Sequence, residues 1–172
     1  MIGPTTPAQP TAAGVPAIVS SRFGVEGAHT IEGYRGSGSY PGYQAIRKVL
    51  EMSPQQVGGV VKDATVLGRG GAGFPTGLKW TFLPKNHTGP IYLAINADES
   101  EPGTFNNRIL MEDDPHQILE GIAISCHAIK SERAYLYLRF EYGKSYRNLQ
   151  SAIDECYAAG ILGNNSMGSG KK

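Results

Sequence analysis

The most informative stretch of this chain is residues 68–82, which read Gly68-Arg69-Gly70-Gly71-Ala72-Gly73-Phe74-Pro75-Thr76-Gly77-Leu78-Lys79-Trp80-Thr81-Phe82. These fifteen positions, called the glycine loop below, hold five glycines, two cations and three aromatic residues. Glycine lets a backbone approach a ligand closely and adopt positive φ, at an entropic cost. Successive backbone N–H groups with a helix starting behind them form an anion site. The composition therefore favours binding of a flat, phosphorylated ligand such as a nucleotide.

The glycine spacing matches neither of two common phosphate-binding motifs. Gly68, Gly70 and Gly73 satisfy G-x-G-x-x-G, but the dinucleotide motif follows a strand and has an acidic residue about 20 positions further on. Here a helix is expected before the loop, and the nearest carboxylate beyond a strand is Asp98, 25 positions after Gly73. The P-loop motif needs Ser or Thr directly after its lysine, and Lys79 is not followed by either. The glycine loop therefore binds phosphate in another way, or it is a structural turn.

Apolar periodicity around the glycine loop predicts an α/β fold with parallel strands and flanking helices. Helices are expected at residues 42–52, 54–63, 77–83, 115–130 and 145–159, and strands at residues 91–97 and 134–140. Strand, helix and strand in that order imply a parallel pair with a right-handed crossover. The continuous apolar run of the first strand is typical of a buried strand. Residues 18–40 show little periodicity and are expected to form an irregular arm.

Capping residues mark the ends of three of these helices. Ser53-Pro54-Gln55-Gln56 supplies an N-cap, a proline at the first helical position and a glutamine at the third, which is the capping-box arrangement. Asp113 or Asp114 is available to cap the helix at residues 115–130. Gly160 follows the last helix and is expected as its C-cap.

Length and charge exclude several classes of protein. The 172 residues suit one domain. The formal net charge of +1, from 16 basic and 15 acidic residues, gives no electrostatic case for nucleic acid or an anionic membrane. The sequence has no apolar run of about 18 residues, so it predicts no membrane-spanning helix. Residues 1–17, rich in Pro, Ala and Thr, lack the features of a secretion signal and are expected to be the disordered tail of a cytoplasmic protein, with residues 18–172 forming the domain.

A second group of polar residues, called the acidic segment below, directly follows the first strand. It reads Asn96-Ala97-Asp98-Glu99-Ser100-Glu101-Pro102-Gly103-Thr104-Phe105 and opens a long acidic loop. Ligands dock beyond the carboxyl ends of strands in open α/β sheets. Carboxylates and an amide could accept hydrogen bonds from ribityl or ribose hydroxyls and ring N–H groups. A Mg²⁺ site is the rival interpretation, and a solvated acidic loop is the third.

Other residues with reactive side chains are expected to be structural. Cys126 and Cys156 have no Cys-x-x-Cys spacing, which disfavours a zinc or iron–sulfur site within this chain, and both are expected to be buried free thiols. His116, beside Asp113 and Asp114, is either a metal ligand or a polar residue at a helix start. The sequence shows no Ser–His–Asp or Cys–His arrangement for nucleophilic catalysis.

The strand pattern stops before a full sheet is complete. Residues 163–172 hold Asn, Ser, Gly and Lys around one Met, where a further strand is expected. Two parallel strands make a thin sheet for an independent α/β domain, so the sequence indicates the front part of a longer protein. The rings of Tyr92, Tyr135, Tyr137 and Phe140 lie on the expected strands and are interpreted as packing residues.

Taken together, the glycine loop and the acidic segment closely resemble the flavin-binding, NADH-oxidising F subunit of bacterial NADH:quinone oxidoreductase, respiratory complex I. The resemblance covers about residues 18–168 and includes His29-Thr30-Ile31 and Met111-Glu112-Asp113-Asp114-Pro115-His116. Two long motifs at the matching separation make it specific. It implies a Rossmann-like domain that binds FMN, takes hydride from NADH at the flavin and passes electrons singly to iron–sulfur clusters.

The resemblance also implies roles for individual residues. Those that would hold the phosphate and ribityl end of FMN are Gly68, Arg69, Gly70, Gly71 and Lys79. Those that would bind the rest of the flavin are Asn96, Asp98 and Glu99. Phe74 and Phe82 look like the rings that stack on the NADH adenine, and Glu101 like the residue that meets the nicotinamide ribose or amide. Glu99 and Glu101 are the candidate catalytic residues, no metal ligand is implied, and no side chain has to donate a proton for the hydride step.

The sequence departs from this family after Gly170. The family continues with a Gly-Glu-Glu segment, a ubiquitin-like domain and a helical domain whose cysteines hold a [4Fe–4S] cluster; none is present, and Cys126 and Cys156 do not match the cluster ligands. We therefore expect an N-terminal fragment, truncated on the C-terminal side of its FMN/NADH-binding domain.

Two functional hypotheses remain. The first is the front part of an electron-input subunit, either of complex I or of the related diaphorase subunits of NAD-linked hydrogenases and formate dehydrogenases. Partners would then be the other peripheral-arm subunits, especially the thioredoxin-like [2Fe–2S] subunit, on the inner face of the bacterial membrane. The second is a non-catalytic flavin-binding stub that cannot turn over NADH.

Overall fold

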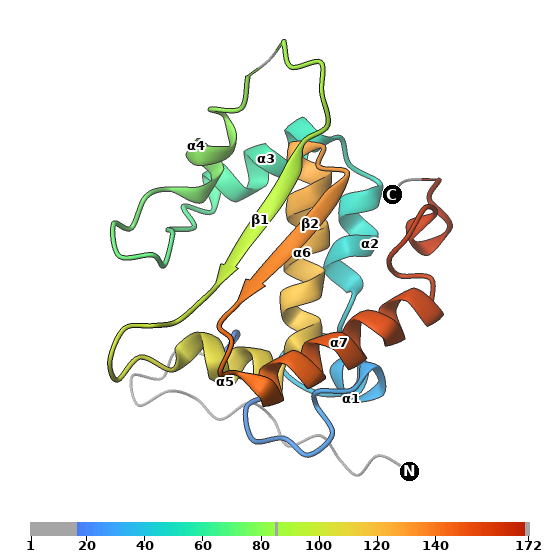
Figure 1. The fold of residues 1–172 in the computed structure, drawn as a ribbon. Helices are drawn as coiled ribbons and strands as arrows, with labels where there is room; N and C mark the ends of the chain where they lie inside the picture. The colour runs from blue at the N-terminus through green and yellow to red at the C-terminus, as the bar shows by residue number, and fades with distance from the viewer. Residues whose placement is uncertain (1–16, 85, 171–172) are drawn as a thin grey trace.

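A computed structural model describes residues 17–84 and 86–170 (Figure 1). The elements are, in chain order, α1 (Ile31–Gly36), α2 (Gln44–Leu50), α3 (Pro54–Asp63), α4 (Thr76–Trp80), β1 (Tyr92–Ala97), α5 (Asn106–Asp113), α6 (Pro115–Ile129), β2 (Arg133–Leu138), α7 (Gly143–Ala158) and a 3₁₀ turn (Ser166–Gly168). The tail expected at residues 1–17 lies outside the described residues, except for Ala17. No helix in the described part of the chain is both long and apolar enough to cross a membrane.

The two strands pair in parallel, which confirms the α/β class predicted from the sequence. The register runs from Tyr92 opposite Arg133 to Ala97 opposite Leu138. Helix α6 crosses behind the sheet, α5 and α7 lie at the carboxyl ends of the strands, and α3 and α4 lie beside β1 (Figure 1). The carboxyl edge of the sheet therefore meets the acidic segment and the start of α7.

Only one face of the sheet is covered, which corrects the expectation of a buried first strand. Leu136 and Leu138 pack with Ala97 on the side of the helices. On the opposite face, Tyr92, Tyr135 and Tyr137 are 55%, 52% and 70% exposed, and Phe140 beyond β2 is 98% exposed. These four rings were expected to pack, and among the described residues nothing buries them. Side chains alternate across a strand, so a sheet with helices on one side leaves every second residue uncovered.

The expected helix ends are largely confirmed. The Ser53 hydroxyl accepts from Gln56 N, and the Gln56 side chain accepts from Ser53 N, as a capping box requires. Asp114 caps α6 by accepting from Gln117 N. Gly160 has a φ of 66° and follows the C-cap of α7 by one residue. This left-handed glycine lets Ile161 N reach the Cys156 carbonyl at 2.9 Å, which closes the helix.

Two helices were not expected. Helix α1 forms inside the arm predicted to be irregular, with Thr30 as its cap. Helix α5 forms inside the predicted acidic loop, and no residue next to it in sequence caps it. Instead, the Glu99 carboxylate accepts from Asn107 N at 2.9 Å and Arg108 N at 3.1 Å. Because this cap comes from seven or more residues away, local sequence patterns did not reveal it.

Candidate functional site

The first half of the glycine loop, residues 68–75, folds like a hairpin between α3 and α4, and its second half contains α4. Gly68 N donates to Phe74 O and Thr76 N donates to Val66 O, both at 2.8 Å, so the loop closes at its base. Gly71 and Gly73 have φ values of 108° and 62°, a region that strongly favours glycine. A Cβ added at Gly70, Gly71 or Gly73 would meet nothing within 4 Å. The glycines therefore keep one side of the loop open rather than filling a packed contact.

The loop also presents unused hydrogen-bond donors and positive charge. Among the described residues, the main-chain N–H groups of residues 69–74 donate no hydrogen bond, although they are exposed enough for water to reach them. Within the same described ranges, neither Arg69 nor Lys79 pairs with a carboxylate. Both side chains are exposed. Backbone amides and cations gathered in this way suit a phosphate group.

A cavity of about 610 Å³ lies between the glycine loop and the first half of β1. Its lining combines glycine backbone, one cation and several apolar or aromatic side chains: Gly68, Gly70, Ala72, Gly73, Phe74, Thr76, Lys79, Trp80, Leu83, Tyr92, Leu93, Ala94 and Ile129. This volume falls within the roughly 300–1,000 Å³ typical of small-molecule sites. A flat ring system with a phosphate on one end matches such a mostly apolar lining with a cationic edge, so the residues present fit a flavin nucleotide.

The structure places only part of the predicted FMN and NADH set at this cavity. Gly68, Gly70, Phe74 and Lys79 line it, whereas Arg69, Gly71 and Phe82 belong to the same loop but not to the lining. The rings of Phe74 and Phe82 lie 5.9 Å apart and tilted by 52°, and both are substantially exposed. The two rings thus form an accessible aromatic pair at the edge of the glycine loop.

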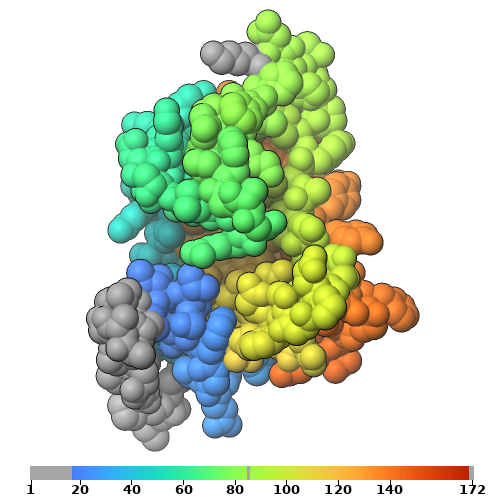
Figure 2. All heavy atoms as spheres, turned by 90° about the vertical axis from the view of Figure 1, so that its left-hand side faces the viewer, coloured from blue at the N-terminus to red at the C-terminus, as the bar shows by residue number. Residues whose placement is uncertain are grey.

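The acidic segment lies at the carboxyl end of β1, on the same face of the molecule as the glycine loop. Figure 2 shows the loop in green above and the acidic region in yellow below. The Asn96 side chain accepts from Asp98 N at 3.0 Å, and the Asp98 carboxylate accepts from the Ser100 hydroxyl at 2.9 Å. Asn96 and Glu101 are exposed, and Asp98 is half-buried. None of the acidic segment is among the residues that line the cavity of the glycine loop.

Glu99 differs from its neighbours because its side chain points into the protein. It is 3% exposed, and both carboxylate oxygens accept main-chain N–H groups at the start of α5. The side chains of Arg139 and Tyr142, which the sequence did not single out, donate to the Glu99 carbonyl. Both follow β2, and the carboxyl ends of parallel strands share one edge, so the predicted pairing of β1 and β2 was a signal that could have found them.

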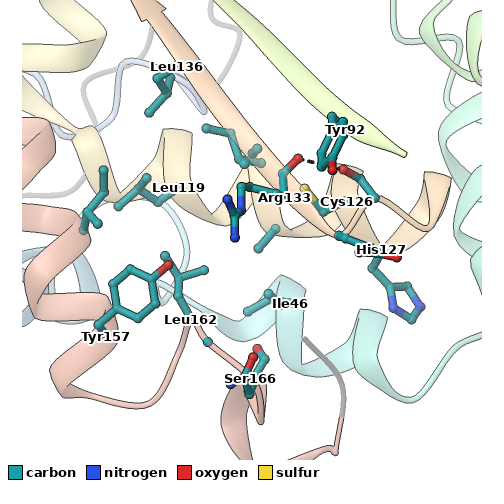
Figure 3. A pocket seen from close by; sticks show the side chains of 18 of the residues that line it. Ile46, Tyr92, Leu119, Cys126, His127, Arg133, Leu136, Tyr157, Leu162 and Ser166 are labelled. Carbon is teal, nitrogen blue, oxygen red and sulfur yellow. Dashed lines mark hydrogen bonds between the residues drawn. The ribbon is translucent and has the colours of Figure 1, made fainter. Parts of the chain in front are cut away.

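A second cavity, of about 420 Å³, lies along the edge of β2, between α2, α6, α7 and the 3₁₀ turn. Arg133 extends into it toward Leu119, Tyr157 and Ile46 (Figure 3). This lining contains no residue of the glycine loop and none of the acidic segment. The cavity that bears on the predicted chemistry is therefore the one beside the glycine loop.

His116 belongs to a buried polar cluster rather than to an exposed helix start. The Tyr43 hydroxyl lies 2.6 Å from His116 Nδ1 and 2.9 Å from Cys156 Sγ, and His116 Nε2 lies 3.3 Å from the Glu155 carboxylate. This Cys–His pair was not anticipated from the sequence. Burial raises the pKa of the Cys156 thiol to about 11, so the thiolate needed of a nucleophile is scarce at neutral pH.

The same cluster bears on the metal alternative and on the cysteines. Burial, opposed by Glu155, lowers the pKa of His116, so its neutral form is favoured. Within residues 17–84 and 86–170, no group of three or more His, Cys, Asp and Glu could hold a metal ion. Both cysteines are free, as expected; Cys156 is buried, whereas Cys126 is only half-buried.

Comparison with known proteins identifies one matching family and several similar proteins. Residues 61–169 match the family described as the Nuo51 FMN-binding domain. The chain is 50% identical over 143 residues to the F 2 subunit of NADH-quinone oxidoreductase from Rhizobium meliloti (strain 1021), covering 83% of this chain and 33% of that protein. It is 51% identical over 142 residues to the F subunit of NADH-quinone oxidoreductase from Aquifex aeolicus (strain VF5), covering 83% of this chain and 32% of that protein.

Solved structures show the same similarity. A crystal structure of NAD⁺-reducing [NiFe]-hydrogenase in the air-oxidized state matches with a TM-score of 0.62 and 37% identity, covering 70% of this chain and 21% of the other. The H₂-reduced state matches with a TM-score of 0.65 and 33% identity, covering 76% and 23%. This chain belongs to the Nuo51 FMN-binding domain family, and it spans about a third of the length of the curated relatives it matches.

Proposed function

We propose that this chain is the front part of the NADH-oxidising flavoprotein subunit of an NADH:quinone oxidoreductase. The observation that carries the proposal is the open glycine loop, which has free amides and which borders, with Lys79, a cavity of mostly apolar lining. Identity of about half to two curated F subunits supports the same conclusion. In the complete protein the parallel strands would belong to a Rossmann-like sheet, with the acidic segment at its carboxyl edge.

The glycine loop would hold the phosphate and ribityl end of FMN. Main-chain N–H groups at Gly70 and Gly71 would donate to phosphate oxygens, and Arg69 and Lys79 would supply positive charge. Charge-assisted hydrogen bonds of this kind are about twice as strong as neutral ones. Leu93 and Ala94 of β1 provide apolar surface for a ring system. The flavin supplies the redox chemistry, and the protein supplies orientation.

The acidic segment would bind the remaining polar groups. Asn96, which is exposed, and Asp98, which is half-buried, would accept hydrogen bonds from flavin hydroxyl or ring N–H groups. Glu101, also exposed, would meet the nicotinamide ribose or amide of NADH. Glu99 would contribute mainly through its main chain, because α5 occupies its carboxylate. Phe74 and Phe82 would stack on the adenine.

In the parent assembly, electrons would leave the flavin for iron–sulfur clusters carried elsewhere. The partners would be other peripheral-arm subunits, including the thioredoxin-like [2Fe–2S] subunit, and the complex would place the chain at the inner face of the bacterial membrane. A [4Fe–4S] cluster would belong to the part of the relatives that this chain does not match.

One observation favours a second candidate function. Both solved structures named above are NAD⁺-reducing [NiFe]-hydrogenases, so a diaphorase subunit that exchanges electrons with a hydrogenase remains the alternative. The curated F subunits are more similar in sequence, at 50% and 51% against 37% and 33%. We therefore rank the quinone oxidoreductase first.

The test is anaerobic addition of NADH to the purified chain loaded with FMN. Hydride transfer from NADH reduces the flavin without any cluster, so an NADH site on this chain should be detected as bleaching of the flavin absorbance. Added quinone is expected to stay oxidised, because the described residues hold no group that could bind a cluster and carry electrons onward. Bleaching of the flavin by NADH would contradict the view that the isolated chain is a non-catalytic stub. NADPH serves as the matched control, since it carries the same hydride on a differently charged ribose.

A further inference from the structure

Glu99 is the point at which four elements of the fold meet. It follows β1, and its carboxylate accepts from the first turn of α5. Its main-chain carbonyl accepts from Arg139 Nη1 at 2.7 Å and from the Tyr142 hydroxyl at 3.3 Å. Arg139 follows β2, and Tyr142 is the N-cap of α7. Two side chains from the second half of the fold therefore hold one residue of the acidic segment.

The two side chains are themselves held in place. Arg139 Nε and Nη2 donate to the Glu141 carboxylate at 3.0 and 3.4 Å. The ring of Tyr142 lies near two guanidinium groups, with the carbon of Arg108 5.5 Å and that of Arg139 5.7 Å from its centroid. The hydrogen bond and charge of Glu141 raise the pKa of Arg139, to which the Asp98 charge also contributes. The guanidinium therefore bridges the end of β2 and the acidic segment as a permanent cation.

We propose that Arg139 and Tyr142 are positioning residues for the flavin site, a role that rests on the function proposed above. They fix the main chain at Glu99, so that Asp98 on one side and Glu101 on the other keep one orientation toward the ligand. Both neighbours lie within two residues of the fixed carbonyl, so a shift at Glu99 moves both. In enzymes, a misplacement of about 1 Å can lower the reaction rate about a hundredfold, because the rate depends on how the reactants are oriented.

The test compares flavin binding by variants of the purified chain. Arg139→Gln removes the guanidinium, Arg139→Lys keeps the charge but loses the planar arrangement of donors, and Tyr142→Phe removes only the hydroxyl. Arg147→Gln, on the exposed face of α7, is the matched control for loss of positive charge. The affinity for FMN and for riboflavin is measured by fluorescence quenching. Riboflavin is included because it lacks the phosphate.

The expected result separates positioning from charge. Arg139→Gln should weaken the binding of FMN and of riboflavin by the same factor, roughly tenfold, as expected for loss of a hydrogen bond from a charged group. Arg139→Lys should restore part of the lost affinity. Lys79→Gln should weaken FMN far more than riboflavin. Arg147→Gln should change neither. In Arg139→Gln, amide exchange should accelerate at residues 96–108 without a change in the urea midpoint.

Three other outcomes are informative. If the unmodified chain binds flavin and both Arg139→Gln and Tyr142→Phe bind it equally well, this inference is overturned and the proposed function stands. If Arg139→Gln unfolds, Tyr142→Phe decides, because it removes a single hydroxyl. If the unmodified chain binds neither flavin, the proposed function fails and this inference fails with it.

Discussion

The Tyr34 hydroxyl donates a 2.5 Å hydrogen bond to the Glu120 carboxylate, which ties α1 to α6 in the buried core. The same carboxylate accepts from Tyr43 N and Ile46 N, each at 3.0 Å. Glu120 therefore satisfies the start of α2 from a different helix, and burial together with this contact raises the pKa of Tyr34.

Replacing Glu120 with glutamine should destabilise the fold. The amide has one oxygen and one NH₂ group, so at least one of the three donors loses its acceptor and faces another donor. We expect a loss of about 2–4 kcal/mol in the free energy of unfolding, measured by urea denaturation. Glu132→Gln, on an exposed residue, is the control and should change little. A Glu120→Gln variant as stable as the control would contradict the described network.

The two cysteines should differ in reactivity toward a thiol reagent. Cys156 is buried with a raised pKa near 11, and Cys126 is half-buried with a pKa that burial also raises. At mildly alkaline pH, Cys126 should react first and Cys156 only when the protein unfolds, as followed by mass spectrometry of the labelled peptides. Rapid labelling of Cys156 in the folded chain would show that the cluster around His116 is open to solvent.

Asp114 should give the stability a specific pH dependence. Burial, opposed by Arg22, raises its pKa from 3.8 to about 6. A group whose pKa is higher in the folded state contributes stability that is complete below the unfolded pKa and lost as the pH rises through the folded one. The difference in the free energy of unfolding between the unmodified chain and Asp114→Asn should therefore change, in favour of the variant, between about pH 4 and pH 6. The size of this change is on the order of 2 kcal/mol.

Asparagine is the matched replacement at this position because it also caps helices well. Urea unfolding of both proteins across that pH range gives the difference directly. A difference that stays constant, or one that grows with pH, would show that the charge of Asp114 is not disfavoured in the folded protein.

Replacing either of two glycines with alanine should change the stability of the fold, in opposite directions. A Cβ at Gly77 would lie 2.5 Å from main-chain atoms of Lys62, where α4 packs on α3. Gly77→Ala should therefore destabilise by about 1–3 kcal/mol through overpacking. Gly121 in α6 has nothing within 4 Å of such a Cβ, so Gly121→Ala should stabilise by about 0.5–1 kcal/mol. Equal effects in thermal melts would argue against the close α3–α4 contact.

The parts of the fold that could be predicted are those determined by residues close together in the sequence. The capping box at Ser53 and the closing glycine at Gly160 act within a few residues, so pattern alone located them. Helix α5 escaped because its cap, Glu99, comes from another segment. The rings of Tyr135 and Tyr137 were misjudged because burial depends on which layers cover a sheet, and strand propensity does not state this.

The candidate site was predictable to the same extent. The composition of the glycine loop predicted a phosphate cradle, because backbone amides and cations are local properties, and phosphate binding there stays a prediction. The inward direction of the Glu99 side chain and its contacts with Arg139 and Tyr142 depend on how β1, β2 and α7 meet. Such contacts between distant segments require the fold itself.

The measurement that tests the central claim most directly is titration of FMN into the purified chain. Saturable one-to-one quenching of flavin fluorescence is expected, weak in affinity, lost in Lys79→Gln and competed by excess non-fluorescent FMN analogues that keep the phosphate. Quenching that is absent, does not saturate, or is unaffected by Lys79→Gln would contradict the claim that the glycine loop binds a flavin nucleotide.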